Sequence, residues 1–99
     1  MAARRTPGED PPPTREQLDA RFRADGLSPR WWSNAPGDTY GRHHHGYQKV
    51  LYCAEGTIVF HTDEGDVALE PGDRLDIEPG TAHSATVGRK GVTCVEASK

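Results

Sequence analysis

The sequence predicts a small all-β domain, a double-sheet jelly-roll barrel with one short helix ahead of it. Only 33% of the 99 residues are hydrophobic, and there are 11 glycines and 8 prolines, a composition that favours short strands and many turns over a helical bundle. From Trp31 onward, turn-forming pairs and clusters separate short β-branched or aromatic runs. Many short strands around a single core indicate an antiparallel barrel, because closing a sheet removes most of its exposed edges.

The first thirteen residues are expected to form a flexible tail. They hold four prolines among charged and small side chains, which offer too little apolar area to offset the entropy of ordering them. Residues 14–99 are then expected to form one domain.

A helix over residues 15–25 is predicted to open this domain. Thr14 and Gln17 have the spacing of a capping box, in which each residue binds the backbone of the other. Leu18 and Phe22 lie four residues apart on one helical face, and Gly26 is placed to end the helix.

The remaining residues are expected to form the strands of the barrel. Trp31 and Trp32 fall on the first strand, where we expect them to cover an open edge of the barrel or a subunit interface. The strands are predicted at about 30–34, 39–44, 48–53, 57–62, 66–69, 74–77, 82–87 and 92–96.

Charge and hydropathy argue against two classes of partner. The formal net charge is −3, and residues 31–99 carry six basic against ten acidic side chains, so we expect no nucleic acid partner. No apolar run approaches the roughly 20 residues that span a bilayer, and the N-terminus lacks a signal-peptide pattern. We therefore expect no membrane partner and a cytoplasmic location, in which Cys53 and Cys94 are free thiols in the core.

Three consecutive histidines are the strongest functional signal. Side chains alternate between the faces of a strand, so His43 and His45 are expected to point one way and His44 the other, toward solvent or an interface. Two imidazoles on the inner face of a barrel can bind one metal ion, and a third ligand must then come from another strand. His83 is the candidate, because it follows the Pro79-Gly80 turn at the start of a predicted strand.

The spacing around these histidines resembles the first motif of the cupin superfamily, which reads G(X)5HXH(X)3,4E(X)6G. Gly37, His43, His45 and Gly56 keep that spacing, and Lys49 stands at the place of the motif's glutamate.

A second stretch resembles the second cupin motif, G(X)5PXG(X)2H(X)3N. Gly72, Gly80 and His83 keep its frame, while Glu78 stands at the place of the proline and Val87 at the place of the asparagine. The resemblance implies a cupin double-stranded β-helix, RmlC-like in fold, with His43, His45 and His83 as ligands of one divalent metal ion: iron, zinc, nickel, manganese or copper.

Lys49 departs from the family pattern, because an ammonium group has no lone pair for a metal. Three neutral imidazoles would leave a coordination position open for water or substrate, as in cupin dioxygenases that hold iron with three histidines, or as in zinc sites that activate water. Lys49 could then orient an anionic small molecule or act as a base, or it could be a structural residue. A bulge at Gly46 could turn Gln48 into a fourth ligand, and Asp76 or Glu78 could be the ion-pair partner of Lys49.

The sequence therefore leaves three functions open. The first is a metal-dependent enzyme of dioxygenase type, an oxidoreductase with Lys49 in the catalytic site and a small, anionic substrate. The second is a cupin that binds or senses a small ligand without catalysis. The third is a cupin that has lost its metal and keeps the barrel as a scaffold. In each case a homodimer is expected, because 99 residues bury little surface alone.

Overall fold

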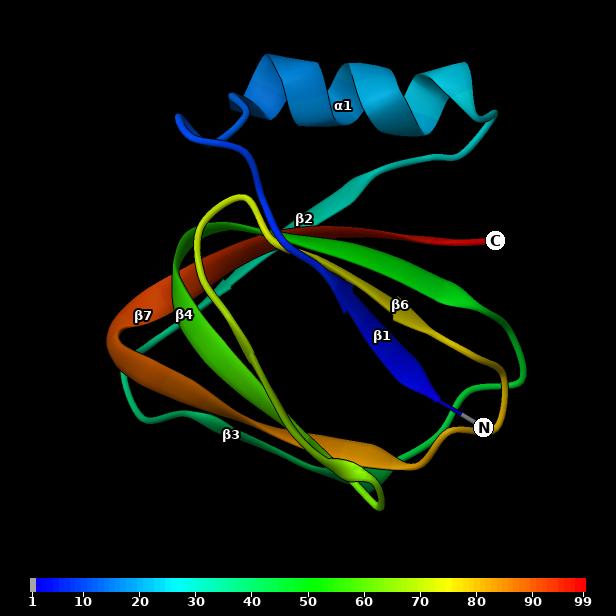
Figure 1. Cartoon of the computed structure of the whole chain (residues 1–99), viewed down its shortest axis with the longest axis vertical. Helices are drawn as coiled ribbons and strands as arrows, with labels where there is room; N and C mark the ends of the chain where they lie inside the picture. Colours follow the sequence, from blue (N-terminus) through cyan, green and yellow to red (C-terminus); the bar gives the residue numbers. More distant parts are fainter. Residues whose placement is uncertain (1) are drawn as a thin grey trace.

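The computed structural model describes residues 2–99, and it has the all-β jelly-roll architecture that the sequence predicts (Figure 1). One helix lies outside a barrel of antiparallel strands. Among the described residues the elements are β1 (Ala3–Thr6), α1 (Arg15–Ala24), β2 (Arg30–Asn34), β3 (Thr39–His43), β4 (Lys49–Thr62), β5 (Gly65–Leu69), β6 (Arg74–Ile77) and β7 (His83–Ser98).

Two long strands, β4 and β7, organise the barrel, because they pair antiparallel along nearly their whole length. The first half of β4 also pairs with β6, and its second half pairs with β5. In the same way β7 pairs first with β3 and then with β2. Each long strand therefore belongs to both walls of the barrel, and β1 extends one wall by pairing with β6.

The sequence pattern predicts two shorter strands in place of each of these long strands. The predicted strands 48–53 and 57–62 are the two halves of β4, and the predicted strands 82–87 and 92–96 are the two halves of β7. The division corresponds to a physical bend, since the β4–β7 register shifts between Cys53 and Glu55 and again between Gly56 and Ile58. Such bulges turn a strand from one wall of a barrel to the other.

The main core fills the space between the two walls of the barrel. Its members alternate along the strands with side chains that face outward, as the period of a strand requires. Cys53 and Cys94 are free, fully buried neighbours on β4 and β7, which confirms their predicted place in the core. The cluster consists of Leu51, Cys53, Ile58, Phe60, Leu69, Leu75, Ile77, Ala85, Val87, Val92 and Cys94.

Helix α1 covers the outer face of the wall that the first half of β4 and the last part of β7 form (Figure 1). The predicted capping box is present, with the Thr14 hydroxyl accepting a hydrogen bond from the Gln17 amide and the Gln17 side chain accepting one from the Thr14 amide. The helix ends at Ala24, just before Gly26, whose φ of 73° lies in the left-handed region that glycine favours. A second apolar cluster joins Leu18 and Phe22 of the helix to Val50, Tyr52, Val95 and Ala97 of the sheet.

The expectation of a flexible tail over residues 1–13 is wrong for Ala3–Thr6, which form strand β1 at the edge of the sheet. Met1 lies outside the described residues. Backbone pairing and polar contacts hold this segment rather than apolar burial: the buried Asp73 carboxylate accepts hydrogen bonds from the Gly8 amide and from Nε of Arg5, at 2.8 and 2.9 Å. A prediction of order or disorder from apolar area alone does not detect contacts of this kind.

Trp31 and Trp32 lie on β2, the last strand of the sheet order, and other parts of the same chain pack against both; the alternative that they cover a subunit interface stays a prediction. Trp31 faces helix α1, where its indole N–H donates to Asp19 at 2.8 Å and the Arg15 guanidinium lies 4.3 Å from its ring centre. Trp32 points to the other face of β2 and packs against the barrel core. The two side chains thus follow the alternation of a strand with two covered faces.

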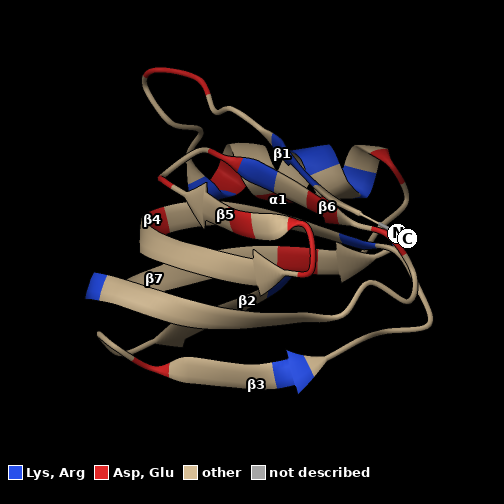
Figure 2. Ribbon diagram, turned by 60° about the horizontal axis from the view of Figure 1, so that its bottom comes forward, with Lys and Arg blue, Asp and Glu red and all other residues tan. Residues whose placement is uncertain are grey.

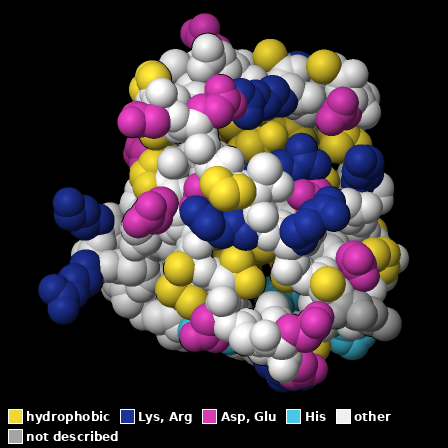
Figure 3. Space-filling model, in the orientation of Figure 1, with side chains coloured by type: hydrophobic (Ala, Val, Ile, Leu, Met, Phe, Trp, Pro, Cys, Tyr) yellow, Lys and Arg dark blue, Asp and Glu magenta, His cyan; other side chains and the backbone are white. Residues whose placement is uncertain are grey.

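The ribbon in Figure 2 has basic and acidic residues on α1 and β6 and basic residues on β1, whereas β7 carries few charged residues. The space-filling view shows the same mixture of basic and acidic side chains on the face toward the viewer, with histidine side chains in its lower half (Figure 3). None of the helices within residues 2–99 is both long enough and apolar enough to cross a bilayer.

Candidate metal centre

His43 and His83 come together because two strands pair. Strand β3 ends at His43, strand β7 begins at His83, and the two residues are direct partners in the β3–β7 register. Their ring centres lie 4.3 Å apart. The predicted position of His83 at the start of a strand is therefore confirmed, and its side chain is almost completely buried, at 1% exposure.

His45 completes the cluster from the segment that follows β3. Its ring centre lies 4.8 Å from that of His43 and 5.3 Å from that of His83. The triple histidine thus runs past the end of a strand, yet the predicted alternation holds, with His44 exposed and its two neighbours half-buried. Ligand atoms of the three rings, one from each histidine, all lie within 4.8 Å of one another.

Hydrogen bonds orient two of the three rings. Nδ1 of His43 lies 2.7 Å from the Gly41 carbonyl oxygen, and Nδ1 of His83 lies 2.9 Å from the Thr81 carbonyl oxygen. A carbonyl only accepts, so each Nδ1 carries the proton and each Nε2 keeps a free lone pair. Histidine ligands of metals are oriented in this way, by a hydrogen bond from the ring nitrogen that does not bind the metal.

The third ring has an unsatisfied nitrogen. Nε2 of His45 is buried and has no hydrogen-bond partner, and it is the only such side-chain nitrogen or oxygen among the described residues. Buried polar atoms without a partner are rare in folded proteins and call for an unseen one. Three imidazoles with free lone pairs are a donor set that suits a divalent transition metal such as zinc, iron, nickel or copper, so the residues present fit a metal ion.

Burial also favours the neutral form of two of these imidazoles, those of His45 and His83. Desolvation lowers the pKa of His83, and it lowers the pKa of His45 with help from the nearby positive charge of Lys49. A neutral imidazole is the form that can bind a metal, because the protonated ring has no lone pair to donate.

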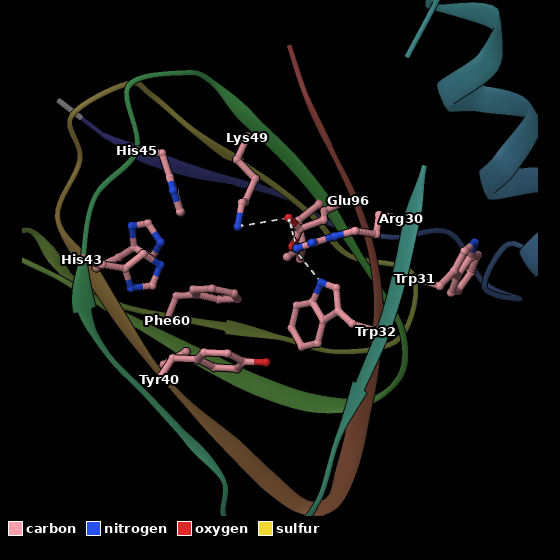
Figure 4. Close-up of a pocket in the computed structure, with 12 residues that line it drawn as sticks. Arg30, Trp31, Trp32, Tyr40, His43, His45, Lys49, Phe60 and Glu96 are labelled. Carbon is pink, nitrogen blue, oxygen red and sulfur yellow. Dashed lines mark hydrogen bonds and ion pairs between the residues drawn. The ribbon is translucent and has the colours of Figure 1, made fainter. Parts of the chain in front are cut away.

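The three histidines open onto a pocket of about 420 Å³ inside the barrel (Figure 4). Apolar side chains of Trp32, Tyr40, Leu51, Phe60 and Ala85 line it, together with the charged groups of Arg30, Lys49 and Glu96. A volume of this size holds a small organic molecule.

Lys49 reaches this pocket and forms an ion pair with Glu96. Its Nζ lies 3.2 Å from Oε2 of Glu96, and both side chains are nearly buried, at 12% and 10% exposure. Oε1 of Glu96 accepts a 2.7 Å hydrogen bond from the Trp32 indole, and Arg30 lies 3.5 Å from Oε2. In Figure 4 the Lys49 amine extends between His45 and Glu96.

The partners suggested for Lys49 from the sequence are wrong. Asp76 pairs with Arg74 at 2.9 Å, and Glu78 accepts from the Ala2 amide at the N-terminal segment. Gln48 contacts Asp76 at 3.5 Å, on the face of the sheet opposite Lys49. The structure therefore does not bring Gln48 to the histidines as a fourth ligand.

Glu96 is the site residue that sequence reasoning missed. A signal was present, since Val92, Cys94 and Glu96 alternate along the last strand, and the first two belong to the core. A carboxylate in such an inward-facing series needs a cationic partner. His61, in contrast, lies outside the site, where it contacts Asp66 and Thr86.

A comparison with known families agrees with the fold and with the motif spacing. The model of the cupin domain family matches residues 30–94. Quercetin 2,3-dioxygenase from Bacillus subtilis (strain 168) is 39% identical over 49 residues, which are 48% of this chain. The chain spans only 14% of the length of that enzyme.

Solved structures show the same architecture. A cupin superfamily protein from Desulfitobacterium hafniense DCB-2 superposes with a TM-score of 0.66 at 17% identity, over 73% of this chain and 65% of the other. An RmlC-like cupin from Shewanella frigidimarina NCIMB 400 superposes with a TM-score of 0.65 at 22% identity, over 73% and 64% of the two chains. At these identities the likeness concerns the fold alone, whereas the family model spans more than half of the sequence, and the chain therefore belongs to the cupin domain family.

Proposed function

We propose that this cupin is a metal-dependent enzyme acting on a small molecule, with one divalent ion held by His43, His45 and His83. The observation that carries the proposal is the arrangement of the three rings. They converge on the pocket with their ligand atoms within 4.8 Å of one another, two are anchored through Nδ1, and the third has a buried nitrogen without a partner. A chance cluster of core histidines would not combine these features.

The chemistry is proposed to be of oxygenase type. A redox-active ion such as iron, held by neutral imidazoles with open positions, supplies the means to activate dioxygen. The partial identity with quercetin 2,3-dioxygenase supports this choice over hydrolysis. Because Lys49 stands where the motif has a glutamate, the three proposed ligands are all neutral. An anionic substrate would then balance the positive charge of the ion.

The chain's own residues have separate tasks in this proposal. Lys49 is the catalytic-site residue that binds the anionic group of the substrate with its N–H donors. Glu96 positions the Lys49 ammonium and is itself held by Trp32. The apolar side chains of the pocket exclude water around the reacting group, which strengthens each electrostatic contact.

Metal content is the first test of this function. Protein purified without a histidine tag is expected to hold one equivalent of divalent metal per chain, and His83→Ala is expected to lose it. The matched control is His44→Ala, because His44 is exposed and lies between two of the proposed ligands in the sequence. Equal metal content in all three proteins would contradict the proposal.

Oxygen consumption separates catalysis from simple binding. Iron-loaded protein is expected to take up oxygen with at least one member of a panel of thiols, diketones and phenols, and Lys49→Met is expected to slow that reaction. Ligand binding without oxygen uptake across the panel would instead indicate a binding or sensor module.

A further inference from the structure

One carboxylate holds both a cation and an aromatic wall of the pocket. Glu96 binds Nζ of Lys49 through Oε2 at 3.2 Å and the indole N–H of Trp32 through Oε1 at 2.7 Å. The Glu96 residue is only 8% exposed. A charge-assisted contact in such a setting fixes the relative position of the ammonium group and the indole ring before any ligand arrives.

The walls of the pocket favour a flat ring. The Trp32 and Tyr40 rings meet edge to face with their centres 5.7 Å apart. On another wall, the ring centre of Phe60 lies 6.2 Å from that of His83. Figure 4 shows these rings around one space, with the histidines on one side and the Lys49–Glu96 pair on another. Aromatic walls at these spacings gain more from contact with another ring than from contact with a saturated chain.

The charges of the pocket favour a single negative group. Two cations, Arg30 and Lys49, face one carboxylate, whose oxygens are both engaged. An ammonium group has three N–H donors, and among residues 2–99 Lys49 has one carboxylate within 4.0 Å. Its remaining donors are therefore available to a ligand. The phenol of Tyr40 is uncharged at neutral pH, and its partial burial raises its pKa further, so this wall adds no negative charge.

We propose that the pocket binds a planar aromatic monoanion, an aromatic carboxylate or a phenolate of one or two rings. Its acidic group pairs with Lys49, and its ring contacts Trp32 and Phe60. The inference deepens the proposed function by naming the substrate class of the same pocket, and it rests on that function only for the step that follows binding. Recognition itself uses Lys49 and the aromatic walls, so it does not require the metal.

Calorimetric titration of the metal-free protein tests the proposal. Three probes separate the effect of charge from that of ring planarity. Benzamide keeps the flat ring of benzoate but lacks its charge, and cyclohexanecarboxylate keeps the charge but has a saturated ring. Benzoate is expected to bind about tenfold or more tightly than either analogue, the size of effect that follows from losing one charge-assisted hydrogen bond or one ring contact. Equal affinities, or no binding of benzoate at millimolar concentration, would overturn the inference.

Variants assign the preference to named residues. Lys49→Met is expected to remove the preference for benzoate over benzamide, and Lys49→Arg is expected to keep most of it. Lys90→Met is the matched control, because Lys90 is exposed and lies outside the pocket. Circular dichroism confirms that each variant is folded. A preference for benzoate over benzamide that survives in Lys49→Met would refute the role of Lys49.

The two proposals fail separately. A protein that binds benzoate as expected but holds no metal would contradict the metal-dependent function and leave the recognition of aromatic anions intact. A protein that holds one metal per chain without preferring benzoate would do the reverse.

Discussion

Glu96 faces three donors from two strands: the Lys49 ammonium of β4, the Trp32 indole of β2 and, more distantly, the largely exposed Arg30 guanidinium of β2. Removing it leaves a nearly buried ammonium group without a partner. We therefore expect Glu96→Ala to lower the free energy of unfolding by about 3 kcal/mol, the scale observed when one member of a buried ion pair is deleted. Denaturant unfolding of the metal-free protein measures this change.

An exposed ion pair provides the control for that prediction. Arg42 and Asp63 approach to 2.8 Å, but their side chains are 58% and 72% exposed. Solvent screens such a pair, so Arg42→Ala should change the free energy of unfolding by less than about 1 kcal/mol. Equal losses in the two variants would show that burial of the Lys49–Glu96 pair has no energetic weight.

Tyr47 contacts His45, the one member of the three-histidine cluster whose Nδ1 has no carbonyl partner among the described residues. Its ring stacks on that of His45, with centres 5.0 Å apart and an angle of 24° between the planes. We expect Tyr47→Ala to weaken metal binding about tenfold or more, as loss of an orienting contact does at other metal sites, while Tyr47→Phe keeps the stack and the affinity. Competition with a chromophoric chelator measures both, and an unchanged affinity in Tyr47→Ala would remove the orienting role.

The sequence was informative about the histidines, whereas it did not identify Glu96 as the partner of Lys49, for a physical reason. His43, His45 and His83 are framed by glycines that make the turns on either side of them, so local spacing predicts their strands and faces. The partner of Lys49 is set by which strand lies beside β4, and Glu96 is 47 residues away along the chain. Only the register, in which Leu51 is opposite Glu96, brings them together.

The bend that turns β4 from one wall of the barrel to the other depends on a glycine. Gly56 has a φ of 73°, and a Cβ at this position would lie 2.0 Å from the Gly91 carbonyl oxygen. Gly56→Ala is therefore expected to cost about 3 kcal/mol or more in the free energy of unfolding, from strain in the left-handed region and from the clash with backbone. Thermal unfolding followed by circular dichroism checks this.

Gly46 is the matched control for the bend. A Cβ there meets no atom within 4 Å, and its φ lies outside the left-handed region. Gly46→Ala should therefore unfold within a few degrees of the original protein, and a comparable loss in both variants would show that the bend does not need glycine.

Strand β1 is held at the edge of the sheet partly by Asp73. Burial opposes ionisation of this carboxyl group, but hydrogen bonds from the Glu70 and Gly8 amides and from Arg5 outweigh it and lower its pKa below the ordinary 3.8. A lowered pKa means that the folded protein binds this proton less readily than the unfolded chain. Its contribution to stability is therefore present above about pH 3.8 and is lost as the pH falls through the lower, folded pKa.

Asp73→Asn is expected to destabilise the protein at pH 7 by about 2 kcal/mol, because the amide NH₂ faces donors instead of accepting from them. The variant should also lose part of the decrease in stability between neutral and acidic pH. Denaturant unfolding at several pH values measures both effects. A parallel pH dependence in the two proteins would show that Asp73 is not the group responsible.

At the level of elements, the sequence predicted strands where apolar residues alternate and failed where they do not. The helix, its cap and the strands β2, β3, β5 and β6 were placed within one or two residues. Strand β1 has no buried residue, so its place depends on pairing with β6 and on Asp73, neither of which appears in a local pattern. The long strands were divided at their bends, because a bulge and a turn both attract glycine.

At the level of the whole molecule, the barrel brings two separate segments to one point. The segment 43–45 and the start of β7 are 38 residues apart at their nearest, between His45 and His83, and the β3–β7 pairing places them side by side. The pocket, with its aromatic walls and the Lys49–Glu96 ion pair, lies next to that point. The homodimer stays a prediction.

The most direct test of the metal centre is a crystal structure of tag-free protein, with diffraction recorded on both sides of the absorption edge of the metal found by elemental analysis. We predict one anomalous peak per chain, within bonding distance of ring nitrogens of His43, His45 and His83. An anomalous map without a peak between the three rings, or with the metal bound elsewhere on the chain, would contradict the metal centre on which the proposed function depends.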